Sequence, residues 1–149
     1  MPVRDASLDD VPTVAGLIRV LADYEGMAGE AVFDDADLAR GLFGDTPAAR
    51  VTLATEQAGD VAGMAVWYVT FSTFLARPGI WLEDLFVLPE HRGRGHGRAL
   101  LDALRARTDG RLEWAVLDWN TPAIGFYDRL GAAPVTGWTR YRWAPLPPR

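Results

Sequence analysis

The stretch GIWLEDLFVLPEHRGRGHGRALL (Gly79–Leu101) decides the fold of this chain. It begins as an apolar segment of strand character that Pro89 ends, passes through a loop rich in glycine and arginine, and continues into an amphipathic helix. Two carboxylates, Glu83 and Asp84, stand next to each other inside the apolar segment. Because burying a charge without a partner is costly, the stretch also raises the question of what these two acids bind.

The sequence on either side of this stretch predicts one mixed α/β (α+β) sheet. Its patterns predict, in chain order, an extended piece at Val3–Asp5, a helix with apolar positions between Val14 and Leu21, a short helix over residues 33–44, strands over residues 49–56 and 60–71, the strand Gly79–Leu88, the helix Gly97–Arg107, a strand over residues 111–119, a helix over residues 120–132 and a last strand over residues 137–143. The tetrapeptide QAGD predicts a hairpin between the first two long strands. This order favours a mostly antiparallel sheet with one parallel β-α-β crossover.

Length and composition limit the chemistry that the chain can perform. At 149 residues it is long enough for one domain, residues 1–149, with a core of ordinary size. It has no cysteine and only two histidines, His91 and His96, which excludes disulfides, thiolate nucleophiles and Cys-based zinc sites, and we expect no metal site. A catalyst built from this chain has to use carboxylates, tyrosine, hydroxyls and backbone groups.

Charge and hydropathy limit the location and the partners. The formal net charge of −5 argues against a general nucleic-acid binder and is compatible with cationic substrates. The first residues, MPVRDASLDDVPTV, lack a basic region followed by an apolar segment, and no apolar run reaches the roughly 18 residues that span a bilayer. We therefore expect a cytoplasmic protein that binds neither nucleic acid nor a membrane.

The loop RGRGHG indicates an anion site. A glycine-rich loop between a strand and a helix presents backbone N–H groups and the positive end of the helix dipole, to which Arg92, Arg94 and Arg98 add charge. A phosphate or pyrophosphate is the natural occupant; a plain connecting turn and an RGG-type RNA-binding segment are the alternatives. The loop is not a Walker A sequence, since no G-K-[ST] follows, and its third glycine comes one position early for the dinucleotide fingerprint.

The motifs around this loop resemble those of a known family. RGRGHG after LEDLFVLPEH resembles the acetyl-CoA signature [RQ]-x-x-G-x-[GA] of the GCN5-related N-acetyltransferases (GNAT), with Arg92, Gly95 and Gly97 at the matching positions. The segments LADYEGM, WLEDLFV, DWNTPAIGFYDRLGA and GWTRYRW are similar to the diamine (spermidine/spermine-type) branch, so the resemblance covers nearly the whole chain. It implies the GNAT fold, acetyl-CoA as cosubstrate, a small polyamine, diamine or amino-acid-like amine as acceptor, and a homodimer.

The resemblance also implies roles for individual residues. It implies that Glu83 deprotonates the amine, directly or through water, and that Tyr127 lies near the thioester sulfur. It implies an acceptor channel lined by Tyr24, Glu25 and Asp84. The implied contacts of acetyl-CoA are Leu85, Phe86, Val87 and Asn120 for the pantetheine arm, and Arg92, Gly93, Arg94, Gly95, His96, Gly97 and Arg98 for the pyrophosphate.

These residue types suit acetyl transfer to an amine. An alkylamine with a pKa near 10.4 is neutral in only about one molecule in 10³ at pH 7, so a carboxylate that attracts the ammonium and accepts its proton assists the reaction. A cationic substrate is therefore the expected partner of Glu83 and Asp84. Because strand alternation sends neighbours to opposite faces, we expect Glu83 alone to point at the reacting nitrogen, with Asp84 in recognition or structure, unless a β-bulge re-aims the other acid.

Each of these roles has a structural alternative. The alternatives are a core aromatic for Tyr127, a solvated edge-strand residue for Glu83, a helix cap for Asn120 and a helix end for Tyr24 and Glu25. We expect His91 and His96 to be surface groups of the loop. The alternative functions are acetylation of another amine, such as an antibiotic or a protein N-terminus, and acyl-CoA binding without catalysis.

Overall fold

The sheet at the centre of the fold contains every strand of the described chain. A computed structural model describes residues 2–147, divided into a first unit that ends at Ala115 and a second that begins at Val116. Within that range five strands form one sheet in the order β1 (Val3–Asp5), β2 (Arg50–Thr55), β3 (Val61–Ser72), β4 (Arg77–Val87) and β5 (Leu112–Trp114). Strands β1 to β4 pair antiparallel and β5 pairs parallel to β4, which confirms the predicted mixed sheet with one parallel crossover.

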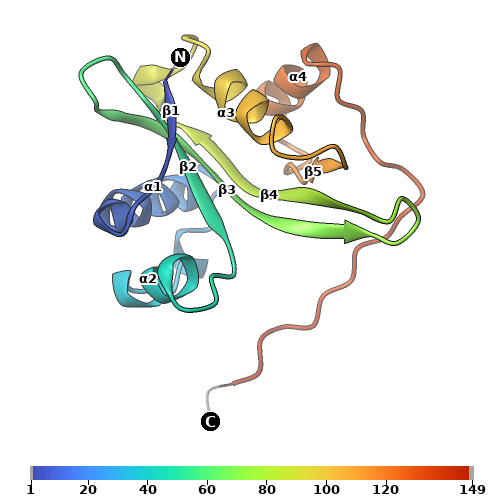
Figure 1. Cartoon of the computed structure of the whole chain (residues 1–149), viewed down its shortest axis with the longest axis horizontal. Coiled ribbons are helices and arrows are strands. Elements are labelled where there is room, and N and C mark those ends of the chain that lie inside the picture. The colour runs from blue at the N-terminus through green and yellow to red at the C-terminus, as the bar shows by residue number, and fades with distance from the viewer. Residues whose placement is uncertain (1, 148–149) are drawn as a thin grey trace. The chain divides into compact units, whose positions relative to one another are not determined.

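The helices of the first unit cover both faces of this sheet (Figure 1). The helical elements are the α-helices α1 (Val11–Tyr24), α2 (Asp35–Phe43) and α3 (His96–Arg105), and the short 3-10 turns Leu8–Asp10, Ala28–Glu30 and Pro89–His91. Helices α1 and α2 lie on one side of the sheet and α3, the crossover helix, lies on the other. The second unit contains α4 (Thr121–Arg129). None of the helices in the described residues combines the length and the apolar character that crossing a membrane requires.

The main core lies between the sheet and the first two helices. Val14 and Leu17 of α1 pack with Leu42 of α2 against the inward side chains of β2, β3 and β4. These buried strand residues are Val51, Leu53, Met64, Val66 and Phe86. The spacing of Val14 and Leu17 is the helical period that predicted this helix. Val51 and Leu53, two residues apart, pack into the same core, as alternate residues of a strand do.

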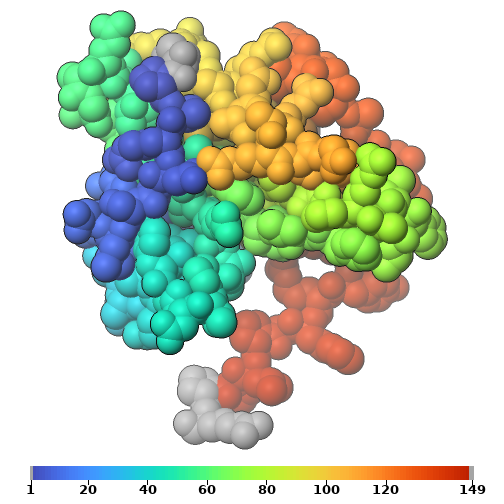
Figure 2. Space-filling model, viewed as in Figure 1, coloured from blue at the N-terminus to red at the C-terminus, as the bar shows by residue number. Residues whose placement is uncertain are grey.

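Helix α3 closes the opposite face with Leu100 and Leu104, whose side chains are fully buried. Figure 2 shows the C-terminal end of α3, in orange, against the blue N-terminal segment. There Arg107 donates to both carboxylate oxygens of Asp5 in β1, at 2.7 and 3.2 Å, and stacks over the ring of Trp67 in β3. The end of the crossover helix is thereby held to the far edge of the sheet.

A β-bulge interrupts β4 at Glu83. Val66 of β3 pairs with Asp84 but the next residue, Trp67, pairs with Leu82, so Glu83 is the extra residue of the bulge. Leu82 consequently shares the α3 face with Trp67, whereas Asp84 shares the α1 face with the core residue Val66. This bulge is the exception to strict alternation that the sequence analysis allowed, so the alternation of a regular strand does not apply across Glu83 and Asp84.

The last two strand predictions are wrong: the first strand is much shorter than predicted, and the second does not form in the described chain. Strand β5 covers only Leu112–Trp114, although the apolar pattern predicted residues 111–119, and no strand forms over residues 137–143 within the described chain. In that segment Trp138, Tyr141 and Trp143 are 83%, 91% and 99% exposed. A strand needs a neighbour to satisfy its backbone, and an alternating pattern cannot show whether one is available.

Candidate functional site

The first part of the site is the edge of β4 that β5 leaves open. Strand β5 pairs with β4 only from Ile80 to Leu82, and no other strand of the described chain lies beside the rest of that edge. The predicted pantetheine contacts Leu85, Phe86 and Val87 belong to this stretch. An extended polar chain can bind such an edge by taking the place of the missing strand.

The approach of β5 to β4 is tight before the strands part. A Cβ on Gly110 would lie 2.1 Å from the carbonyl oxygen of Pro78, and one on Gly79 would lie 2.5 Å from that of Arg111. Only glycine fits at these two positions without a backbone shift. The strands therefore meet closely at one end and open toward Glu83.

The second part of the site is the loop between β4 and α3. Gly93 and Gly95 adopt φ angles of 75° and 88°, in the left-handed region that glycine enters without strain. Gly95 is also the N-cap of α3 and has no side chain with which to cap the helix. The loop and the first turn of α3, with Gly97 and Arg98, hold the backbone N–H groups and dipole end that suit a phosphate.

The three arginines of the loop have protein partners. Arg92 donates from Nε to the carbonyl oxygen of Val87 at 2.9 Å, Arg94 donates to Glu56 at 2.9 Å, and Arg98 lies 3.5 Å from Asp102. The positive charge predicted for an anion is thus also used to hold the loop. Glu56, which lies in the turn between β2 and β3, was not predicted as a site residue.

The third part of the site is a set of three carboxylates, Glu25, Glu83 and Asp84. Glu25 is the C-cap of α1, and its burial raises the pKa of its carboxyl. The pKa of Asp84 is raised to about 6, first by burial and then by the negative charges of Glu83 and Glu25. Glu83 is exposed and accepts a hydrogen bond from Trp81 Nε1 at 2.9 Å. None of these three acids forms an ion pair with a basic residue of the described chain, so the group suits a positively charged ligand.

Tyr24 and Arg92 join the acidic set to the loop. The Arg92 guanidinium lies 5.3 Å from the ring centre of Tyr24 and 5.5 Å from that of Phe86, at cation–π distance. The rings of Tyr24 and Phe86 are 6.4 Å apart. The end of α1, the end of β4 and the first arginine of the loop are therefore one packed unit.

The two histidines do not both lie on the surface. The side chain of His96 is fully buried, so the expectation of a surface group is wrong for it, and His91 is half-buried. Both rings hydrogen-bond to Glu56. No sequence signal pointed to this contact, because Glu56 stands 35 and 40 residues before its two histidine partners.

The second unit holds the other two predicted site residues. Asn120 is the N-cap of α4, and its Oδ1 accepts a hydrogen bond from the backbone N–H of Ala123 at 3.4 Å. Tyr127 lies within α4, with its ring 5.5 Å from that of Phe126. The cap role of Asn120 was the structural alternative to pantetheine binding, and one residue can serve both.

The parts of the site that lie in the first unit suit two ligands, one that carries a phosphate and one that is a cation. The open edge and the glycine loop suit an extended ligand that carries a phosphate, and the three carboxylates suit a cation. Asp84, with a pKa near neutrality, is able both to bind an ammonium and to exchange a proton with it.

The chain is similar to known acetyltransferases. Residues 14–132 match the model of the acetyltransferase (GNAT) family. Over 95% of its length the chain is 32% identical to the thialysine N-epsilon-acetyltransferase of Bos taurus, 91% of which is covered. It is 27% identical to the L-ornithine N5-acetyltransferase of Arabidopsis thaliana, with 91% of this chain and 81% of that protein covered.

A solved structure has the same fold. An integron cassette protein of V. cholerae matches with a TM-score of 0.80 over 97% of this chain and 92% of its own, at 24% identity. At this level of identity the likeness concerns the fold alone.

The raised pKa of Asp84 predicts a pH-dependent stability. A carboxyl whose folded pKa lies at about 6, above its ordinary 3.8, stabilises the fold while protonated, and this contribution is lost as the pH rises through 6. Asp84→Asn imitates the protonated form, so the variant and the wild type should be equally stable near pH 4. By pH 8 the variant should be more stable by about 2–3 kcal/mol in urea unfolding.

The control for this experiment is Glu90→Gln, which removes an exposed acid of the same unit. Its stability difference from the wild type should not change between the two pH values. A constant difference for Asp84→Asn as well would show that Asp84 has an ordinary pKa.

Proposed function

The chain belongs to the acetyltransferase (GNAT) family, and we propose that its acceptor is the terminal or side-chain amine of a small cationic molecule, such as a diamine, a polyamine or a basic amino acid. It is an N-acetyltransferase, and the family uses acetyl-CoA as cosubstrate. The observation that carries the proposal is the meeting of Glu25, Glu83 and Asp84 beside the open edge of β4. The named activities of the thialysine and ornithine enzymes, both on side-chain amines, support it.

The binding of acetyl-CoA is assigned to the open edge and the loop. The backbone of Leu85, Phe86 and Val87 would pair with the pantetheine arm, and the N–H groups from Gly93 to Arg98 would hold the pyrophosphate. The glycine N-cap of α3 and the lack of a neighbouring strand along this edge in the described chain fit both tasks. Bound there, acetyl-CoA supplies the acetyl thioester.

The carboxylates prepare the amine. We assign proton acceptance to Glu83, directly or through water, and binding of the ammonium to Asp84 and Glu25. Burial and the neighbouring acids make ionisation of Asp84 less favourable than that of an ordinary aspartate, and an ammonium beside it offsets this cost. The neutral amine then attacks the acetyl group directly, since the chain has no cysteine to carry it.

Two further roles come from the family motifs. Tyr127 is assigned the protonation of the leaving thiolate, and Asn120 a contact with the pantetheine arm. The N–H groups of Phe86 and Val87 are assigned the stabilisation of the negative charge that develops on the acetyl oxygen.

Tyr127→Phe should lower kcat about 10²-fold and leave the Kd of acetyl-CoA unchanged, because it removes the proton donor for the leaving thiolate and no contact that binds acetyl-CoA.

The protein is proposed to act as a cytoplasmic homodimer. At the end of the β3–β4 hairpin Val69, Phe71 and Phe74 are 62%, 65% and 92% exposed, which is unusual for apolar side chains so close together. A second copy that covers them would explain this patch and agree with the family resemblance.

An acceptor panel tests the proposed function. Purified protein is mixed with acetyl-CoA and putrescine, spermidine, lysine, ornithine, thialysine or an aminoglycoside, and free thiol is recorded. We expect release with diamines or basic amino acids that exceeds release with the neutral-tailed control 4-amino-1-butanol by at least about tenfold, because a hydrogen bond to a charged group contributes about 1.5–3 kcal/mol and about 1.4 kcal/mol corresponds to tenfold. Release with the aminoglycoside alone would identify an antibiotic acetyltransferase, and binding without release would identify an acyl-CoA-binding module.

Two substitutions separate the roles of the neighbouring acids. Glu83→Gln should lower kcat about 10²–10³-fold and leave the KM of the amine within about twofold, because it removes the proton acceptor. Asp84→Asn should raise the KM of the amine and lower kcat less. The reverse pattern would exchange the two roles, and Glu90→Gln should match the wild type in both parameters.

The mass in solution tests the dimer. Light scattering should give twice the chain mass of 16.3 kDa for the wild type. The double variant Phe71→Ser, Phe74→Ser should shift the population toward the monomer. A wild type that elutes as a 16.3 kDa species at micromolar concentration would contradict the dimer.

A further inference from the structure

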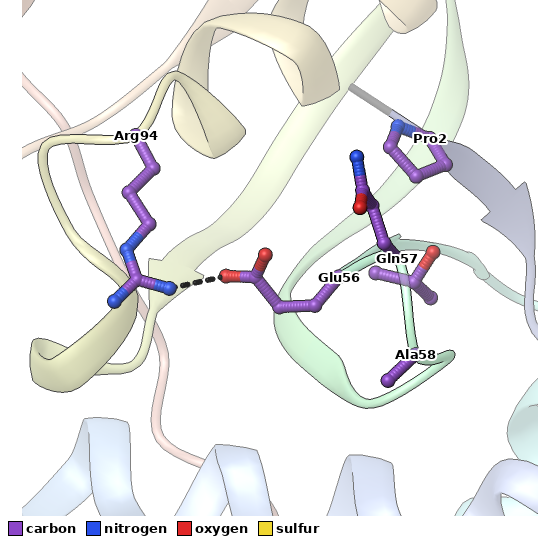
Figure 3. A pocket seen from close by; sticks show the side chains of 6 residues that line it. Pro2, Glu56, Gln57, Ala58 and Arg94 are labelled. Carbon is purple, nitrogen blue, oxygen red and sulfur yellow. Dashed lines mark hydrogen bonds and ion pairs between the residues drawn. The ribbon is translucent and has the colours of Figure 1, made fainter.

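Glu56 gathers three donors of the glycine-arginine loop onto one oxygen atom. Its Oε1 lies 2.9 Å from His91 Nδ1, 2.9 Å from an Arg94 guanidinium nitrogen and 3.0 Å from His96 Nε2. Figure 3 shows Glu56 reaching from the β2–β3 turn toward Arg94, at the side of a cavity that Gln57 also lines. The contacts join two parts of the chain that the sequence separates by 35 to 40 residues.

Glu56 is held as an anion by its partners. The pKa of its carboxyl is lowered to about 2, first by the hydrogen bond from His96 and then by those from His91 and Arg94. A carboxylate only accepts, so each imidazole nitrogen that faces it carries a proton. In His96 this leaves Nδ1 buried and without a partner in the described chain, which suits the tautomer whose single proton is on Nε2.

The three donors surround the glycines of the loop. His91 precedes Gly93, Arg94 stands between Gly93 and Gly95, and His96 follows Gly95. Glycines at positive φ have the widest choice of backbone conformations and lose the most entropy when they are fixed. Because Glu56 binds residues on both sides of Gly93 and Gly95, it limits the backbone conformations of these glycines before any ligand binds.

We propose that Glu56 is a positioning residue for acetyl-CoA: it fixes the loop of residues 91–96 so that its backbone N–H groups are already directed at the pyrophosphate. This inference rests on the proposed assignment of that loop to acetyl-CoA. Glu56 itself touches neither the pyrophosphate nor the reacting atoms in this role. Its effect is on the entropy of binding, because a preorganised loop loses less freedom when the ligand binds.

A rival role for Glu56 leads to the opposite result. If Arg94 were the principal phosphate ligand, its ion pair with Glu56 would compete with acetyl-CoA. Removing Glu56 would then free the guanidinium and tighten binding. The direction of the change in Kd therefore separates a positioning residue from a competitor.

The test measures acetyl-CoA binding and loop exchange in the full chain. The Kd of acetyl-CoA is measured by calorimetry for the wild type, Glu56→Ala, Glu56→Gln and Gln57→Ala, and amide hydrogen exchange is measured without ligand. We expect Glu56→Ala to weaken binding about tenfold and to speed exchange at residues 92–97, while the slowest amides of β3 keep their protection. Glu56→Gln should fall between, since an amide oxygen still accepts hydrogen bonds.

The control and the kinetics make the result specific. Gln57→Ala alters the exposed neighbour in the same turn and should bind acetyl-CoA within twofold of the wild type. With saturating acetyl-CoA, kcat and the amine KM of Glu56→Ala should stay within about twofold, because the chemistry of transfer is untouched. Unchanged or tighter binding, or unchanged loop exchange, would overturn the proposal. Binding by the wild type without acetyl transfer would contradict the proposed function instead, and the Kd and exchange data would still decide the role of Glu56.

Discussion

The site depends on the parting of β5 from β4 after only three paired residues. Ile80 to Leu82 have a parallel neighbour, and the rest of β4 offers its backbone on that side without another strand of the described chain. The bulge at Glu83 follows directly on the last paired residue and turns Asp84 to the face that α1 covers. One short stretch of strand thus creates both an edge for an extended cosubstrate and an acidic face for its acceptor.

The charges on the two sides of this stretch are arranged in different ways. On the loop side, positive groups are paired with protein acids, Arg94 with Glu56 and Arg98 with Asp102, so the backbone N–H groups and the helix dipole remain for the ligand. On the acceptor side, Glu25, Glu83 and Asp84 lie near one another, and the pKa of Asp84 is raised first by burial and then by the negative charges of the other two acids. The fold tolerates this repulsion where the proposed ligand is a cation, which agrees with the general finding that perturbed carboxyls mark functional sites.

Local sequence patterns predicted most helices and strands, but they could not predict contacts between segments that are distant in the sequence. The helical spacing of Val14 and Leu17 and the hairpin signal QAGD led to α1 and to the β2–β3 pair. The bulge was foreseen only as a possibility, because register depends on two strands at once. The end of β5 at Trp114 and the lack of a strand at residues 137–143 depend on which neighbours are available. Glu56 was missed for the same reason: nothing near it in the sequence marks its partners.

Glu25, Glu83 and Asp84 are proposed to bind a cationic acceptor. The most direct test is to titrate Asp84 by carbon NMR with and without a diamine. We expect a free carboxyl with a pKa of about 6, and we expect this pKa to fall by at least about one unit when the amine binds, because an ammonium nearby favours the ionised form. Assignment comes from the signal that Asp84→Asn removes. An ordinary pKa that does not respond to the amine would show that Asp84 does not bind the acceptor.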